Sequence, residues 1–485
     1  MSTLADLTGF RFYDYFQQIC AIPRESGNEK GISDYLVRFA AERGLVCRQD
    51  EALNIVIKKK ASPGYAGEPP LILQAHMDMV CEKTADSKHD FLHDPILPQE
   101  EDGYITADLT TLGADNAVGM SYILAILEDA NMPHPPIEAV ITTNEEVGMK
   151  GMSALDASDL EGTRMINLDA DEEGKLFTSC AGGTRIYVEL PMAYAPVSTD
   201  RSPYTLRVQG LAGGHSGIDI NRNRANAIVL LARAIDLLGK KFELPVGDLF
   251  CGGKMNVIPH DASAVLWPKE ADAEKMILET ARINGIFSAE YRMSEPDLSL
   301  TLQKSSPNCG QVLSTQTLRH LLAAIFLLPN GVLGFSQYMK DVLDISCNLG
   351  ALEMKGENAV LSLFLRSNTN SKMDDILSRI KYFGETPGAA INVAGSYPAW
   401  EFRKDSPLRE LCTKAYLKLN GKAPEAASIH GGLECALMTL KKPDLDMVSF
   451  GPTILEAHTS NERVEIASFI NTWNLLVRIL ENKEK

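Results

Sequence analysis

A histidine and an aspartate follow the end of an apolar segment early in the chain. Residues 71–73 (Leu-Ile-Leu) lead into His76, and Asp78 follows two residues later. A short apolar run of this kind predicts a buried strand of a parallel sheet, and ligands of such sheets bind where the strands end. Since residues two apart on a strand point to one face, Asp78 could orient the His76 ring while the other ring nitrogen binds a metal ion. A histidine that only forms a hydrogen bond at a strand end would give the same pattern.

Chemically similar residues lie at other expected strand or loop ends of the chain: Asp115, the adjacent pair Glu145 and Glu146, Asp169, and His458. Taken singly, each could cap a helix or lie in a solvated turn, and either Asp115 or Asn116 is a natural N-cap for the apolar helical segment that follows them. Taken together, they predict two Zn²⁺ ions about 3.5–4 Å apart, each held by one histidine, one terminal carboxylate and one shared carboxylate. The expected ligands are His76 and Asp169 for one ion and Glu146 and His458 for the other, with Asp115 bridging the two.

Glu145 has a different expected role. It is adjacent to Glu146, and two neighbouring side chains are not expected to face the same ion. Glu145 is therefore free to act as a general base that takes a proton from a metal-bridging water and passes it to the leaving amine. Two further histidines, His89 and His93, lie in a polar segment rich in aspartate and proline, where a solvated loop is the simpler explanation.

Alternating strands and helices must position these residues. Up to residue 184 the alternation predicts a doubly wound α/β domain. Between residues 185 and 398, half-exposed strands separated by helical stretches predict an inserted α+β domain with antiparallel sheet. We therefore expect a discontinuous catalytic domain (1–184 plus 399–485) with a mixed, mainly parallel sheet, interrupted by a lid and substrate-binding domain (185–398). Helices are expected near 223–239, 269–284, 315–328, 372–384, 407–419, 431–440 and 464–481.

The composition excludes several classes of function. The 485 residues suffice for two or three domains, and 45% hydrophobic with 23% charged residues is typical of a globular protein. A net charge of -17 without a basic run argues against nucleic acid or an anionic membrane as partner. No apolar stretch reaches about 18 residues, so no transmembrane helix is expected. Nine cysteines without a C-x-x-C pair and an N-terminus without a signal-peptide pattern favour reduced thiols and a cytoplasmic location.

Five motifs in order along the chain carry the candidate ligands: His76-Met-Asp78, Thr110-Thr-Leu-Gly-Ala-Asp115-Asn, Thr143-Asn-Glu145-Glu146-Val-Gly, Asn167-Leu-Asp169 and Glu456-Ala-His458. In type and order they resemble the metal-site motifs of the M20 metallopeptidases. Within that family the chain is similar to the bacterial aminoacyl-histidine (Xaa-His) dipeptidases over essentially its whole length. The resemblance implies a cytoplasmic dinuclear-zinc dipeptidase that hydrolyses unblocked dipeptides, especially Xaa-His, with Mn²⁺ or Co²⁺ as possible substitute metals.

The resemblance also implies roles for individual residues. It implies that Asp78 orients His76 and that Glu145 is the base. It further implies that His215, in Gly-Gly-His-Ser-Gly, stabilises the oxyanion, and it assigns substrate binding to Asn256, Arg366, His430 and Gly432. From the residues alone, His215 could equally be a solvated histidine in a glycine turn, and Arg366 could form an ordinary surface salt bridge.

Two other functions remain open. A related M20 amide hydrolase, such as a tripeptidase or a deacylase, would share every metal ligand and differ only in its lid contacts. A non-catalytic metal-binding protein would have lost Glu145 or a metal ligand, and neither is missing from the sequence. The expected partner is a small dipeptide substrate, and a homodimer through the lid is one option for the oligomeric state.

Overall fold

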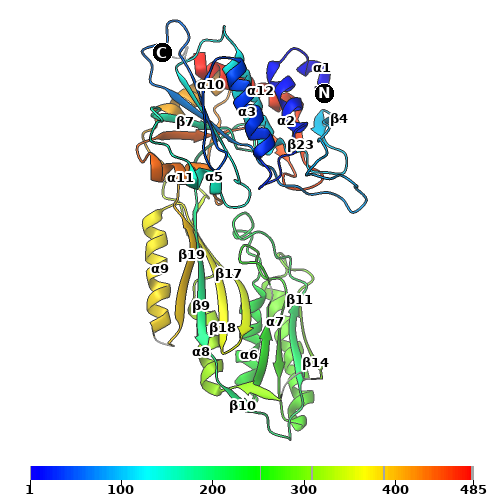
Figure 1. Ribbon diagram of the computed structural model, residues 1–485. Helices are drawn as coiled ribbons and strands as arrows, with labels where there is room; N and C mark the ends of the chain where they lie inside the picture. Colours follow the sequence, from blue (N-terminus) through cyan, green and yellow to red (C-terminus); the bar gives the residue numbers. More distant parts are fainter. Residues whose placement is uncertain (1, 252, 307–309, 386–387, 482–485) are drawn as a thin grey trace. The chain divides into compact units, whose positions relative to one another are not determined.

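The computed structural model describes residues 2–251, 253–306, 310–385 and 388–481 (Figure 1). The chain divides into two compact units. Unit 1 comprises Met1–Cys180, Phe402–Ile429 and Leu433–Lys485, and unit 2 comprises Ala181–Glu401 together with the short segment His430–Gly432. None of the helices in the described ranges is long and apolar enough to cross a membrane.

Unit 1 is built on an eight-stranded sheet with the strand order β1-β2-β6-β3-β7-β21-β8-β20. The central strands β6, β3, β7 and β21 are parallel, whereas β1–β2, β2–β6 and β21–β8 pair antiparallel. This mixed, mainly parallel sheet confirms the predicted fold class. The strands are β1 Val46–Gln49, β2 Ile55–Lys59, β3 Leu71–His76, β6 Ile137–Thr142, β7 Arg164–Asn167, β8 Lys175–Cys180, β20 Glu425–Ile429 and β21 Asp446–Ser449.

Helices lie on both faces of the central strand β3. Neighbouring residues of a strand point to opposite faces, so Gln74 and Ala75 contact different helices. Ala75 faces α4 (Ala114–Glu128), and a Cβ added to Gly119 of that helix would lie 3.1 Å from the Ala75 Cβ and 2.6 Å from the Leu168 carbonyl oxygen. A glycine is therefore required for this close approach of helix and sheet. On the other face, Gln74 contacts Glu434 at the start of α11 (Glu434–Lys441).

The hydrophobic core of unit 1 lies around α4. Helices α2 (Arg11–Cys20) and α12 (Ile466–Glu481) pack with it through an aromatic cluster of Phe12, Tyr122, Phe469 and Trp473. The other helices are α1 Leu4–Leu7, α3 Lys30–Glu42, α5 Lys150–Ala154 and α10 Pro407–Asn420. A small second sheet contains β4 Gln99–Glu101, β5 Tyr104–Thr106, β22 Ile454–Leu455 and β23 Arg463–Glu465.

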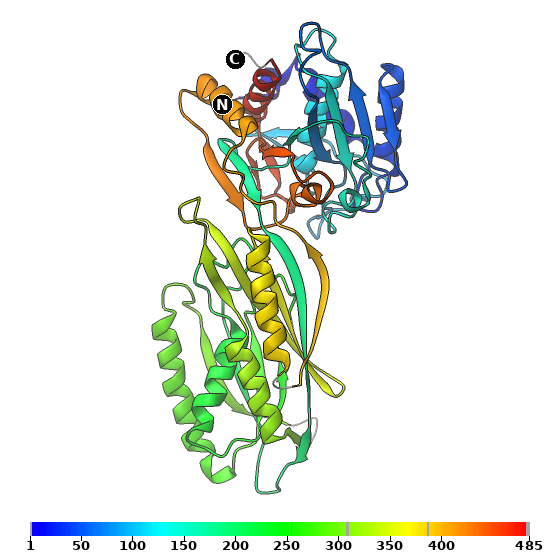
Figure 2. The ribbon, with the colours of Figure 1, turned by 90° about the vertical axis from the view of Figure 1, so that its left-hand side faces the viewer.

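Unit 2 contains antiparallel sheets, as predicted for the inserted α+β part. Its five-stranded sheet has the order β16-β17-β18-β9-β19, and α9 (Asn370–Glu385) lies along it (Figure 2). The strands are β9 Gly182–Pro191, β16 Gly331–Phe335, β17 Leu343–Lys355, β18 Asn358–Ser367 and β19 Ala390–Tyr397. The other sheets contain β11 Tyr204–Gln209, β12 Val246–Phe250, β13 Ala262–Leu266 and β14 Ser299–Lys304, and β10 Tyr194–Pro196 with β15 Gln311–Leu313.

Helix starts in unit 2 differ from the predicted ranges for local reasons. The helix expected from residue 223 is α6 (Ala227–Gly239), which begins later because the Asn226 side chain caps it by accepting hydrogen bonds from Ile228 and Val229. The helix expected at 269–284 is α7 (Ala273–Glu290), and a short 3₁₀ turn precedes it. The remaining long helix is α8, Thr315–Leu327.

The register of the parallel strands in unit 1 brings the predicted site residues to one edge of the sheet. His76, the last residue of β3, lies opposite Thr142, the last residue of β6. Gln74 lies opposite Asn167, the last residue of β7. The turn after β6 and the segment after β7 therefore begin at the same sheet edge as His76, which is the carboxyl edge where ligands of such sheets bind.

Candidate active site

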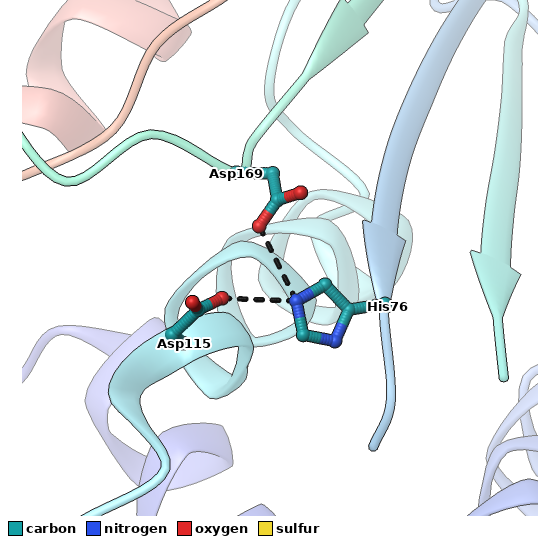
Figure 3. Close-up of side chains that lie close together, drawn as sticks. All are labelled: His76, Asp115 and Asp169. Carbon is teal, nitrogen blue, oxygen red and sulfur yellow. Dashed lines mark hydrogen bonds and ion pairs between the residues drawn. The ribbon is translucent and has the colours of Figure 1, made fainter. Parts of the chain in front are cut away.

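His76 ends β3 with its side chain buried, at 1% exposure. Its Nε2 atom lies 2.9 Å from Asp115 Oδ1 and 3.3 Å from Asp169 Oδ1 (Figure 3). Its Nδ1 atom lies 3.4 Å from Asp78 Oδ1, and the same oxygen accepts a hydrogen bond from the backbone N–H of Glu145 at 3.0 Å. Both ring nitrogens therefore face carboxylates, and Asp78 lies on the side where an orienting group is expected.

Asp115 lies in an irregular first turn of α4. The backbone of Asp115 and Asn116 is non-helical, and Asn116 Oδ1 accepts a hydrogen bond from the Gly119 N–H at 2.9 Å. Asn116 thus caps the regular part of the helix, which contradicts the capping alternative for Asp115. The Asp115 carboxylate instead faces two imidazoles. Its Oδ2 atom lies 3.2 Å from His458 Nε2, and its Oδ1 atom faces His76.

His458 and Glu146 complete the cluster from two distant segments. His458 lies in the loop between β22 and β23 with a left-handed backbone, at φ 64°. Its Nε2 atom is 3.0 Å from Glu146 Oε1. Glu146 lies in the turn after β6, where its N–H donates a hydrogen bond to Asp78 Oδ2 at 3.2 Å. The Asp78 carboxylate therefore also fixes the backbone of the turn that carries the two glutamates.

The cluster contains two groups of three candidate ligands that share Asp115. The ligand atoms of His76, Asp115 and Asp169 lie within 4.8 Å of one another, and so do those of Asp115, Glu146 and His458. These are the two sets that the sequence predicts for a pair of ions. Imidazole nitrogens and carboxylate oxygens in this ratio are donors that Zn²⁺, Mn²⁺ and Co²⁺ accept, so the residues present fit divalent metal ions.

The electrostatics of the cluster also fit a cation. Burial raises the pKa of Asp169 to about 6, although the neighbouring His76 opposes this shift. Hydrogen bonds to Asp115 and Glu146 raise the pKa of His458 to about 11, against the effect of burial. A divalent cation would neutralise the crowded carboxylates, and it must displace the imidazole protons. Metal binding should therefore strengthen as the pH rises.

Glu145 belongs to neither of the two groups that share Asp115. Removal of its carboxyl group from water raises its pKa well above the usual range, and the negative charges of Asp169 and Glu146 add to the shift. It forms a third close group with His76 and Glu146. A carboxylate beside the ligands, but outside the two sets, is well placed to accept a proton from a reacting water.

Glu434 is a buried acidic residue at this site that the sequence analysis did not identify. Its Oε2 atom accepts a hydrogen bond from Thr142 Oγ1 at 2.5 Å and another from Gln74 Nε2. The side chain is fully buried, and burial raises its pKa to about 8. The available signal in the sequence was Gln74, a polar residue within an otherwise apolar strand, which requires a polar partner on that face.

We expect Glu434→Gln to flatten the pH dependence of stability of the metal-free protein. A folded-state pKa of about 8, above the unfolded value, means that the protonated carboxyl stabilises the fold at low pH and that this contribution is lost as the pH rises toward 8. Between about pH 5 and pH 8, the free energy of unfolding should fall on the order of 3 kcal/mol more in the wild type than in the variant. Urea unfolding in chelator at several pH values measures this difference, and parallel curves for the two proteins would contradict it.

In unit 2, His215 lies in a glycine-rich loop after β11. Its Nδ1 atom accepts hydrogen bonds from the N–H groups of Gly217 and Ile218, each at 3.3 Å. Its proton is therefore on Nε2, which provides an N–H donor. Burial, and then the positive charge of Arg366, lower the pKa of His215 and keep the ring neutral. The loop thus fixes the tautomer of this histidine, unlike a freely solvated one.

Arg366, near the end of β18, is a buried cation. Its side chain is 5% exposed, its guanidinium lies 4.2 Å from the centre of the Phe364 ring, and its Nη1 atom donates to Tyr397 Oη at 3.4 Å. No carboxylate of the described ranges forms an ion pair with it, and burial lowers its pKa. This contradicts the surface salt bridge, and it leaves a desolvated positive charge that requires an anionic partner.

The other predicted substrate-binding residues also belong to unit 2. His430 Nε2 lies 2.7 Å from Ser346 Oγ, its Nδ1 atom has no hydrogen-bond partner in the described part of the chain, and burial lowers its pKa to about 3. Asn256 has an exposed side chain, and its carbonyl oxygen accepts the Ser216 N–H at 2.9 Å, next to His215. Gly432 is the last residue of the short segment His430–Gly432, which belongs to unit 2.

Comparison with known proteins agrees with this architecture. Residues 72–482 match the model of peptidase family M20/M25/M40. The chain is 35% identical to the cytosol non-specific dipeptidase of Escherichia coli (strain K12), over 99% of each chain. The crystal structure of aminoacylhistidine dipeptidase from Vibrio alginolyticus matches with a TM-score of 0.91 and 32% identity, covering 99% of this chain and 98% of that one. Aminopeptidase PepT from Bacillus cereus shares the fold, with a TM-score of 0.56 and 17% identity over 98% of each chain.

These matches extend over nearly the whole sequence and confirm the resemblance inferred from the five motifs. The chain therefore belongs to peptidase family M20/M25/M40 and is a metal-dependent peptide hydrolase.

Proposed function

We propose that this protein is a cytoplasmic dinuclear-zinc dipeptidase that hydrolyses unblocked dipeptides, including Xaa-His, with Glu145 as the general base. The observation that carries the proposal is the position of Asp115, whose two carboxylate oxygens face different histidines. A carboxylate shared by two ligand groups is the expected bridge of a two-metal site. The names of the E. coli and Vibrio relatives support dipeptides as substrates.

The bound ions would supply Lewis-acid polarisation of the scissile carbonyl and a water of lowered pKa. They would be held by His76, Asp115, Glu146, Asp169 and His458. Glu145 takes the proton of the attacking water and then delivers it to the departing amine. Asp78 orients His76 through Nδ1 and fixes the backbone N–H of Glu145, so the ligand and the base share one support.

Residues of unit 2 would bind the substrate. Arg366 would pair with the free carboxylate of the dipeptide, because it is a buried cation without a carboxylate partner among the described residues. His215 would donate its Nε2–H to the developing oxyanion. Asn256, His430 and Gly432 would contact the rest of the substrate. Pairing of the C-terminal carboxylate with Arg366 would favour dipeptides over longer chains.

The test is a substrate panel with protein that has been stripped of metal and titrated with Zn²⁺. The panel contains several Xaa-His dipeptides, dipeptides without histidine, a tripeptide and an N-acyl amino acid. We expect dipeptide hydrolysis to return as two equivalents of Zn²⁺ per chain are bound. Full activity without metal would refute the proposal, and cleavage of only the tripeptide or the N-acyl amino acid would assign a different amide substrate.

We expect Arg366→Met to lower kcat/KM for a dipeptide by roughly 30- to 700-fold, because loss of one partner of a buried charge pair costs about 2–4 kcal/mol. The same variant should hydrolyse a C-terminally amidated dipeptide as slowly as the wild type does, since that substrate has no carboxylate. Arg185→Met is the matched control, because Arg185 is exposed and its guanidinium lies 5.9 Å from the same Phe364 ring. Equal losses on both substrates would show that Arg366 does not bind the carboxylate.

A further inference from the structure

The turn before Asp115 is held by two buried, oppositely charged side chains from distant parts of the chain. Arg24 is 1% exposed, and its Nη1 atom donates to the carbonyl oxygens of Met77 (3.1 Å) and Asp78 (3.0 Å) while Nη2 donates to that of Gly113. Glu462 is 3% exposed, and its carboxylate contacts the same turn. Both charged side chains therefore form hydrogen bonds with backbone groups inside the protein.

Glu462 binds the amide groups of the turn. Its Oε2 atom accepts the N–H of Gly113 at 2.8 Å, and its Oε1 atom accepts the N–H of Asp115 at 3.2 Å. Charge-assisted hydrogen bonds of this kind are stronger than neutral ones, and buried carboxylates persist only when they are satisfied in this way. The backbone on both sides of Ala114 is thereby fixed at two points by one carboxylate.

Gly113 shows how closely the two side chains enclose the turn. Its φ is +68°, and a Cβ added to it would lie 2.5 Å from Arg24 Nη2 and 2.7 Å from Met79 Sδ. A side chain here would have to displace a guanidinium that is itself fully buried. The close packing and the left-handed backbone both require glycine at this position.

Together, Arg24 and Glu462 join three of the five segments that carry predicted metal ligands, namely those of His76, Asp115 and His458. Arg24 links the end of β3, which carries His76, to the turn before Asp115. Glu462 lies four residues after His458 in the chain, and it therefore links the segment that follows His458 to the same turn. Neither side chain is among the candidate ligand groups, and their hydrogen bonds go to the backbone that positions the ligands.

We propose that Arg24 and Glu462 are positioning residues that hold Asp115 at the geometry needed to bridge two metal ions. The proposal rests on the dinuclear site of the proposed function. Without this clamp, the turn can rotate about Gly113, and one Asp115 oxygen then loses its alignment with one of the two histidines. The effect should therefore fall on metal affinity and coordination, and only through them on activity.

Glu462→Gln tests this proposal, with Glu295→Gln in unit 2 as the matched control. Glu295 is also 1% exposed and also accepts two backbone N–H groups, from Ala212 at 2.6 Å and Ala225 at 2.8 Å. Glutamine keeps the size of either side chain but turns an NH₂ group toward one of the two amides. Both variants should lose thermal stability, whereas only Glu462→Gln should change the metal centre.

The measurements are Zn²⁺ affinity by competition with a chelating dye and the visible spectrum of the Co²⁺-substituted protein. For Glu462→Gln we expect at least one ion to bind 10-fold or more weakly and the Co²⁺ spectrum to change, with both unaltered in Glu295→Gln. If Glu462→Gln does not fold, Arg24→Lys is used, since one ammonium group cannot serve all three carbonyl oxygens. Wild-type affinity and spectrum in the folded variant would overturn the proposal. The Zn²⁺ stoichiometry of the wild type separately tests the dinuclear site.

Discussion

Replacement of Glu145 by glutamine is expected to lower kcat for dipeptide hydrolysis by about 10²–10⁴-fold, the usual contribution of a general base. Glutamine has nearly the same shape but cannot take the proton of the attacking water. Metal binding should persist, because Glu145 lies outside the two candidate ligand groups that share Asp115. Single-turnover kinetics with saturating Zn²⁺, together with direct determination of bound Zn²⁺, measure the two properties separately.

The control for Glu145→Gln is Glu161→Gln, a substitution of an exposed glutamate that should leave both properties unchanged. Two results would contradict the assignment. Near wild-type turnover would show that another group accepts the proton. Loss of one Zn²⁺ equivalent would instead make Glu145 a ligand, which the third close group of Glu145 with His76 and Glu146 would explain.

Asp115→Asn is expected to reduce tightly bound Zn²⁺ from two equivalents per chain to at most one, and to abolish measurable dipeptide hydrolysis. The amide keeps one acceptor oxygen but has neither the charge nor the second oxygen that a bridging ligand needs. The substitution also separates function from folding, because asparagine is as good an N-cap as aspartate. A role in helix capping would therefore leave both metal binding and activity intact.

Asp90→Asn is the matched control for Asp115→Asn. Asp90 Oδ2 lies 2.8 Å from His93 Nδ1, so this is also an aspartate–histidine pair, but both side chains are exposed. We expect this variant to bind two equivalents of Zn²⁺ and to retain full activity. Binding of two equivalents by Asp115→Asn would refute the bridging role, and loss of an equivalent in Asp90→Asn would move one ion to the loop around residue 90.

The sequence alone was informative about the chemistry that is encoded locally. Apolar strands that end in His76 and in the turn with Glu145 lie side by side and parallel, so their ends meet at one edge of the sheet. This geometry follows from the period of the pattern and from the rule that ligands collect at carboxyl edges. The mixed sheet and the inserted antiparallel part were predictable for the same reason. Continuous apolar runs indicate buried parallel strands, and apolar–polar alternation indicates half-exposed antiparallel strands.

Local reasoning left open which residue caps α4, and the tertiary structure decided this. Asp115 and Asn116 are both good capping residues, and their order in the sequence does not select between them. Asn116 caps because its side chain turns to the Gly119 N–H, while Asp115 faces two histidines that are brought close only by folding. The burial of Arg366 was equally beyond local reasoning, since its strand alternates as a half-exposed strand would.

The supports of the site were decided by the tertiary structure alone. Glu434 meets Gln74 from 360 residues away, and Glu462 meets Gly113 from 349 residues away. A polar residue in an apolar strand, such as Gln74, signals that a polar partner exists, but no periodicity or motif identifies that partner, because the two residues belong to different elements far apart in the chain. The residue types and strand ends thus determined which chemistry this protein carries. The packing of distant segments decided how the ligands are held, because a buried charge finds its partners only when the chain has folded.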